Sequence, residues 1–228
     1  MNRKDGPIIS WLYNHITLKS EPPWRYELAN GLTHALGIAL SVVATVMFVI
    51  LTAQGVISGA LAAASLVYGV TMIVLYTSST AYHLVQGPVA KRVARVMDHV
   101  SIYFLIAGTY TPVAVYIDTP AARNVLIIAW IVTVVGALFT LRFWGRYGVL
   151  HVLFYLAMGW MIVVIWEDVI DSVSVSFIRW GIAGGISYTV GTTVYGMQKL
   201  PYNHAIWHLF VLGGSICFFL GIYLELLL

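Results

Sequence analysis

The sequence predicts an all-α membrane protein with seven transmembrane helices. Of its 228 residues, 60% are hydrophobic and only 9% are charged, whereas a soluble domain carries roughly 25% charged residues. Seven stretches are apolar over the roughly 20 residues that a helix needs to cross a bilayer. The basic residues between these stretches favour alternate loops. We therefore expect a cytoplasmic segment over residues 1–28 and one membrane domain over residues 29–228.

We expect no signal peptide in the N-terminal segment, because it has neither an apolar core nor a small-residue cleavage site. We expect the first span to act as an uncleaved insertion signal. Within the segment, Ile8, Trp11, Leu12 and Ile16 fall at helical spacing. That pattern fits a short helix lying in the cytoplasmic membrane interface, and a partly ordered tail is the open alternative.

The seven predicted spans follow one another with short polar or Pro/Gly-marked connections and no internal repeat. Each is read as a helix, because a single segment can satisfy its backbone hydrogen bonds in lipid only in that form. The spans are 29–53, 57–84, 94–117, 122–142, 148–166, 174–196 and 202–226.

Lysine and arginine set the predicted orientation, since they accumulate on cytoplasmic loops. The N-terminal segment carries four of them, the loop after span 2 three, the loop after span 4 two and the loop after span 6 one. The opposite side has only Arg123 and Arg179. The N-terminus is thus predicted to be cytoplasmic and the C-terminus outside, in a multi-pass protein of the plasma (bacterial inner) membrane.

Composition also excludes some functions and partners. The single cysteine, Cys217, has no intrachain partner for a disulfide. The net charge of +3 belongs to the loops that set topology, so nucleic acid is not an expected partner. Membrane lipids are the expected partners, and the sequence names no protein partner.

Ionisable residues from four spans converge at the cytoplasmic level of the predicted bundle. His83 ends span 2, Asp98 begins span 3, and His204 and His208 begin span 7. Such groups within spans are rare and usually mark function. Span 1 contributes a polar stripe at the same level. We expect this stripe to brace the site by hydrogen bonds; it consists of Glu27, Asn30 and His34.

Metal binding is the predicted purpose of this layer. His204 and His208, at i and i+4, project from one helix face and can reach one ion. With His83 as third ligand, three imidazoles would leave a fourth position open for water, a common arrangement in catalytic zinc sites. Asp98 would hold that water, and Ser79 lies one turn before His83. An interhelical hydrogen-bond network without metal is the alternative.

The other histidines receive different interpretations. His151, near the start of span 5, is a rival third ligand. His99 points about 100° away from Asp98 and is expected to face another helix or the interface, while His15 is expected to be solvated.

Four motifs along the chain are distinctive: "NGLTHALG", "STAYH", "DHVSIYFLIAGTYTP" and "PYNHAIWHLFVLGGSICFF". They closely resemble the bacterial hemolysin III proteins, within the progestin and adipoQ receptor family that includes the adiponectin receptors. The resemblance covers residues 24 to 226. It implies that His83, His204 and His208 bind Zn²⁺ and that Asp98 holds the zinc-bound water, with Ser79 completing the motif. It also implies a link to metal-dependent hydrolases, since animal members of the family are linked to ceramide hydrolysis.

Two functional hypotheses follow. The first is an intramembrane zinc hydrolase of a lipid amide or ester, in which Asp98 is the general base and Ser79 orients the water or Asp98. The second is a sensor or regulator of the membrane in which zinc is structural. A transporter is disfavoured, because inverted repeats and charges through the outer half are absent. "Hemolysin" is a family label here, since the chain lacks the amphipathic character of a secreted pore-forming toxin.

Overall fold

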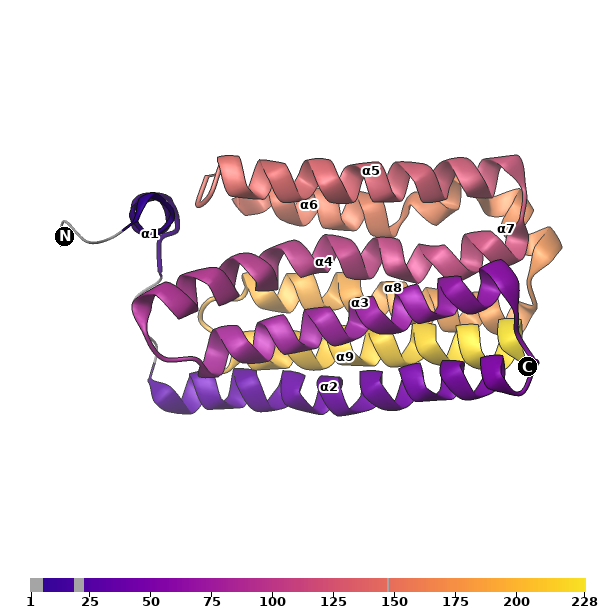
Figure 1. The fold of residues 1–228 in the computed structure, drawn as a ribbon, viewed down its shortest axis with the longest axis horizontal. Helices are drawn as coiled ribbons and strands as arrows, with labels where there is room; N and C mark the ends of the chain where they lie inside the picture. Colours follow the sequence, from indigo (N-terminus) through magenta and orange to yellow (C-terminus); the bar gives the residue numbers. More distant parts are fainter. Residues whose placement is uncertain (1–5, 19–22, 147) are drawn as a thin grey trace.

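The computed structural model describes residues 6–18, 23–146 and 148–228, and within these ranges every regular element is helical. The long helices run along one axis and reverse direction at each connection (Figure 1). The elements are α1 (Pro7–His15), α2 (Trp24–Ala53), α3 (Gly59–Leu84), α4 (Pro88–Ile117), α5 (Pro120–Arg142), α6 (Gly148–Gly159), the 3₁₀ helix η1 (Met161–Ile165), α7 (Trp166–Ser172), α8 (Val175–Gly196), α9 (Asn203–Ile222) and the π-helical turn η2 (Tyr223–Leu227).

Six helical segments are long and apolar enough to cross a membrane by length and composition. They are α2, α3, α4, α5, the composite segment Leu150–Ser172, and α9 extended to Leu227. The chain is therefore a multi-pass membrane protein. The sixth predicted span, 174–196, corresponds to α8, which forms a 22-residue helix but is not among the six segments that meet these criteria. Arg179 and several glycines, serines and threonines lower its hydropathy. Hydroxyl groups within the helix pair with backbone carbonyls, as in Thr189 donating to the Gly185 carbonyl.

The fifth predicted span is a broken helix rather than a continuous one. α6 ends at Gly159, and the 3₁₀ turn η1 precedes α7. Tyr110 of α4 forms hydrogen bonds with two backbone groups at this break. Its hydroxyl donates to the Gly159 carbonyl at 3.0 Å and accepts from the Ile162 N–H at 2.8 Å. Irregular backbone inside a membrane protein needs such partners, because lipid supplies none.

Close helix packing depends on small residues that face large rings. A Cβ added at Gly37 of α2 would overlap the ring of Tyr76 on α3, and one at Gly136 of α5 would overlap the ring of Tyr103 on α4. Without side chains at these positions, the backbones approach closely, as in other membrane bundles. Tyr76 and Tyr103 are consequently buried almost completely.

The predicted N-terminal helix is present as α1, which lies crosswise to the long helices at one end of the bundle (Figure 1). Leu12 and Ile16 are buried, whereas Ile8 is exposed. Two arginines of α4 hold the chain that follows α1. Arg92 donates to the Ile16 carbonyl at 3.0 Å, and Arg95 donates to the Thr17 carbonyl.

Candidate metal centre

The ends of α3 and α9 bring three histidines together at the bundle end where α1 lies. α3 ends one residue after His83, and α9 begins one residue before His204. The start of α9 is fixed by Tyr202, which adopts a left-handed conformation (φ 57°). Its ring stacks on Tyr26 of α2 with centroids 4.3 Å apart. A non-glycine residue in this region is uncommon and persists where its surroundings hold it.

His83, His204 and His208 each offer a nitrogen to a common point. These nitrogens all lie within 4.8 Å of one another, close enough that the three side chains could hold a metal ion. His83 and His208 are buried, at 3% and 1% exposure. The ring of His204 lies 4.5 Å from that of His208 and 5.0 Å from that of His83, centroid to centroid. The two histidines of α9, at i and i+4, therefore lie beside a third imidazole, that of His83 on α3.

Glu27 of α2 orients the His83 ring. The His83 Nδ1 lies 3.1 Å from the Glu27 carboxylate, which in turn lies 3.4 Å from Lys91 Nζ on α4. The amide nitrogen of Asn30 is 3.5 Å from the same Nδ1, at the limit of a hydrogen bond. Because a carboxylate accepts, this contact favours the tautomer with hydrogen on Nδ1 and a lone pair on Nε2.

Asn30 and Thr33 of α2 orient the His208 ring in the same way. His208 Nδ1 lies 3.1 Å from the Asn30 carbonyl and 3.2 Å from the Thr33 hydroxyl oxygen. The Thr33 hydroxyl donates to carbonyls of its own helix, so it accepts from His208. Again the hydrogen belongs on Nδ1. Among the described residues, the Nε2 atoms of His83 and His208 are buried and have no hydrogen-bond partner.

This pattern is the one expected of metal-binding histidines. A ligating histidine commonly donates its other ring N–H to a carboxylate or backbone carbonyl, which fixes the tautomer. Here Glu27 supplies the carboxylate and Asn30 the carbonyl. The two helices that carry the histidines are thus supported from α2.

Two further polar side chains lie in this part of the bundle. Ser79, one helical turn before His83, is fully buried, and its Oγ has no partner among the described residues. His34 of α2 stacks on His208 with ring centroids 3.6 Å apart. Its nitrogens are not part of the three-histidine cluster.

The side chain of Asp98 on α4 is 14% exposed, and it lies beside His99, which is outside the cluster. Its carboxylate lies 3.7 Å from Nδ1 of His99, which also contacts the Arg95 carbonyl at 3.0 Å. His151, the rival third ligand, lies on α6 against Tyr103 of α4 and Thr140 of α5, outside the cluster. His15 is exposed.

The contacts of Thr33 with His208 and of Lys91 with Glu27 were not predicted from the sequence. Thr33 lies three residues after Asn30 on α2, so its position in the polar stripe was available as a signal. The sequence indicates only that Lys91 is one of the basic loop residues that set the membrane orientation. In the structure it forms a partly buried ion pair with Glu27. No sequence pattern indicates that contact, because it joins two helices through a loop-proximal side chain.

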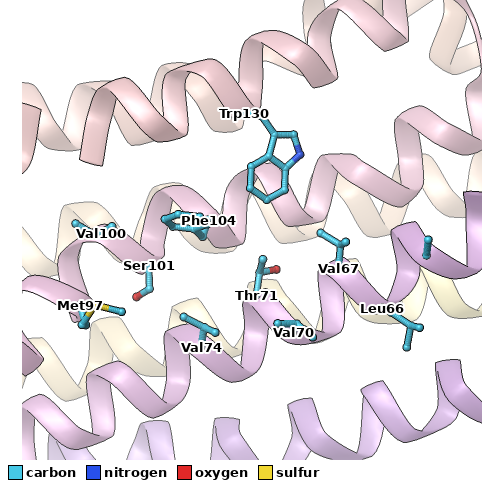
Figure 2. Close-up of a pocket in the computed structure, with 11 residues that line it drawn as sticks. Leu66, Val67, Val70, Thr71, Val74, Met97, Val100, Ser101, Phe104 and Trp130 are labelled. Carbon is cyan, nitrogen blue, oxygen red and sulfur yellow. The ribbon is translucent and has the colours of Figure 1, made fainter. Parts of the chain in front are cut away.

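A separate apolar cavity of about 630 Å³ lies between α3, α4 and α5. Figure 2 shows Val70, Val74, Phe104 and Trp130 around it. Its hydroxyl groups are already engaged, as in Ser101 donating to the Asp98 carbonyl. The lining therefore suits hydrocarbon, and the cavity contains none of the three histidines.

Comparisons with known proteins identify the same family that the sequence motifs resemble. The family described as Haemolysin-III related matches residues 23–219, from the start of α2 into α9. Hemolysin-3 of Bacillus cereus is 38% identical over 194 residues, which cover 85% of this chain and 88% of that protein. The Hemolysin-3 homolog of Bacillus subtilis (strain 168) is also 38% identical over 194 residues, covering 85% of this chain and 91% of that protein. The human monocyte to macrophage differentiation factor is 24% identical over 164 residues, covering 69% of this chain and 68% of that protein.

Proposed function

The chain belongs to the Haemolysin-III related family, and from its histidine cluster we propose that it is an intramembrane zinc-dependent hydrolase of a lipid amide or ester. One observation carries the proposal. The Nε2 atoms of His83 and His208 are buried without partners among the described residues, while each Nδ1 is held by α2. Buried polar atoms are normally paired, so these nitrogens suit a ligand from outside the chain.

The donor set suits zinc. Neutral imidazoles bind Zn²⁺ as well as other transition metals, and three of them with one open position are typical of catalytic zinc sites. A zinc ion bound there would polarise a carbonyl and lower the pKa of its water. The role of His83, His204 and His208 is then to hold this ion, and that of Glu27 and Asn30 to keep the rings in place.

Asp98 and Ser79 are the proposed reacting side chains. We assign Asp98 the role of general base, which takes a proton on its carboxylate, and Ser79 the role of orienting the water or Asp98. The hydroxyl of Ser79 supports this role, because it is fully buried and has no partner among the described residues. Catalytic hydrogen bonds are often long in a ligand-free protein, so the contact of Asp98 with His99 is compatible with a catalytic role.

A membrane lipid is the substrate class that the fold supports. Six helices are suited to a bilayer, and the cavity of about 630 Å³ beside α3 and α4 is lined by hydrocarbon side chains. Its volume lies within the range of about 300–1,000 Å³ that is common for ligand sites. A substrate of this kind would enter laterally from the bilayer.

A second function, a membrane sensor with structural zinc, is favoured by one observation. Within the described residues, the Asp98 carboxylate has its ion-pair contact with His99, which is outside the three-histidine cluster. A metal held by His83, His204 and His208 would then only tie α3 to α9.

Substitution of Asp98 by asparagine separates the two functions. For a hydrolase, Asp98→Asn should keep its zinc and turn over lipid at least about 100-fold more slowly, because an amide cannot replace a general base. Zinc content and hydrolysis of N-acyl and ester lipids in vesicles measure both effects. Asp118→Asn, at the exposed end of the same helix, is the matched control. An Asp98→Asn protein with undiminished turnover would exclude the general-base role.

We also propose that α8 crosses the membrane, which adds a seventh span to the six, and that the metal centre faces the cytoplasm in a bacterial inner membrane. Lys91, Arg92 and Arg142 lie at the bundle end of the histidines, whereas Arg123 and Arg179 lie at the other end. A reporter fused after Leu228 should therefore read as outside and one inserted at Gly87 as cytoplasmic. The reverse pattern would contradict the orientation, and two cytoplasmic reporters would contradict the seventh span.

A further inference from the structure

His34 of α2 carries two ring nitrogens that no described residue pairs with. Its side chain is 2% exposed, and both Nδ1 and Nε2 are shielded from solvent. A neutral imidazole presents one N–H donor and one lone pair. Burying both without partners costs free energy, and the few such groups that proteins retain call for an explanation.

The position of His34 relates it to the metal centre without making it a ligand. Its ring is parallel to that of His208, at an interplanar angle of 15° and a centroid distance of 3.6 Å. A ring in this position lies one ring thickness from the plane of His208. His34 is therefore in direct ring contact with the cluster formed by His83, His204 and His208, although it is not part of that group.

Packing alone does not account for an imidazole at this position. The face of His34 contacts His208, and its ring meets Tyr76 of α3 edge-on at 5.1 Å and 85°. Neither contact uses a nitrogen. The Asn30 carbonyl and the Thr33 hydroxyl of the same helix engage His208 Nδ1. Ring stacking and edge contact do not require nitrogen atoms, so the two nitrogens, unpaired among the described residues, indicate a partner from outside the chain.

We propose that His34 donates a hydrogen bond to a carbonyl-type oxygen of a lipid headgroup bound beside the metal. The proposal rests on the zinc site proposed above. Three imidazole ligands leave a position that an oxygen ligand can take, and an N–H from the adjacent ring can hold that oxygen. His34 is thus a ligand-binding residue of the site, distinct from the three histidines that hold the ion.

The test uses the full-length protein in lipid vesicles, loaded with Co²⁺ so that its visible absorption reports the ligands around the ion. The probe is dodecanohydroxamate, a single-chain amphiphile whose headgroup binds metals through a carbonyl oxygen. His34→Phe keeps the ring contacts and removes both nitrogens, whereas His34→Gln retains an N–H donor. His15→Phe is the control, because His15 is exposed on α1.

We expect all four proteins to hold Co²⁺ with the same spectrum before the probe is added. His34→Phe should bind the hydroxamate about tenfold more weakly, as expected for the loss of one charge-assisted hydrogen bond. His34→Gln should recover part of this loss, and His15→Phe should match the unsubstituted protein. If His34→Phe does not fold, His34→Leu takes its place with the same expectation.

Three results would overturn the inference. Unchanged affinity in His34→Phe would mean that the nitrogens do not contact the ligand. Loss of Co²⁺ from His34→Phe would mean that His34 supports the metal itself. Absence of Co²⁺ from the unsubstituted protein would refute the metal site and this inference together, whereas normal Co²⁺ binding with unchanged probe affinity would refute only the role of His34.

Discussion

Two polar clusters share the helices α3 and α9. One is the metal centre, with His83 on α3 and His208 on α9. The other, here called the tyrosine–serine cluster, comprises Tyr68, Tyr76, Tyr188 and Ser215. Tyr76 precedes His83 by seven residues and Ser215 follows His208 by seven. At about 1.5 Å per residue, the second cluster lies roughly 10 Å deeper in the bundle.

The clusters differ in how their polar atoms are paired. In the tyrosine–serine cluster every hydroxyl has a partner: Tyr76 donates to Ser215 Oγ at 2.6 Å, the Tyr188 hydroxyl is 2.9 Å from the same atom, and Tyr68 donates to the Ser215 carbonyl at 3.3 Å. In the metal centre the Nε2 atoms of His83 and His208 have none among the described residues. The main difference between the clusters is therefore hydrogen bonding. Polar atoms that are all hydrogen-bonded form an internal network, whereas buried atoms without partners mark a candidate ligand site.

The largest expected effect is the loss of metal from His208→Ala. The unsubstituted protein should contain about one zinc per chain, and two remaining imidazoles rarely hold zinc tightly at neutral pH. Zinc per chain is measured by elemental analysis after dialysis. Ser215→Ala, on the same helix but in the tyrosine–serine cluster, should keep its zinc. Full occupancy in a His83→Ala, His208→Ala double variant would refute the site and remove the contrast between the clusters.

A smaller effect is expected for Glu27→Gln. The amide oxygen can still accept from His83 Nδ1, but the negative charge that supports the imidazole is gone. Such changes next to a metal ligand typically weaken metal affinity by about 10–100-fold. Competition with a chelator of known affinity measures it. Glu167→Gln, an exposed carboxyl outside the cluster, should leave the affinity unchanged. Equal affinities in the two variants would show that Glu27 does not support the site.

The contrast between the clusters also explains what the sequence could reveal. Histidines are rare in membrane spans, so His83, His204 and His208 stand out by type, spacing and predicted depth. The structure brings these three together. By comparison, Tyr76 is one of 14 tyrosines, and Ser215 lies in an apolar run with no special spacing. A hydrogen bond between common residues of distant segments leaves no local signal.

The helices themselves were mostly predictable, because apolar length is a property of the local sequence. The break after Gly159 was not, since it depends on the hydroxyl of Tyr110, which is 49 residues away in the chain. The contact of Asp98 with His99 could not be predicted from the sequence either. Adjacent residues on a helix point about 100° apart, and only the neighbouring helices decide which way each side chain turns.

The smallest expected effect is that of Tyr76→Phe on the tyrosine–serine cluster. The change removes the hydroxyl that donates to Ser215 Oγ, but Tyr188 remains beside that atom. Hydrogen bonds between membrane helices contribute about 0.6 kcal/mol on average, so the free energy of unfolding should fall by about that amount. A denaturant titration in mixed micelles measures the fall, and a double-mutant cycle with Ser215→Ala isolates the pair. The phenyl ring keeps the edge contact with His34, so zinc content should not change. Loss of zinc from Tyr76→Phe would show that the two clusters act as one site, because a paired hydroxyl two turns from the histidines would then control the metal.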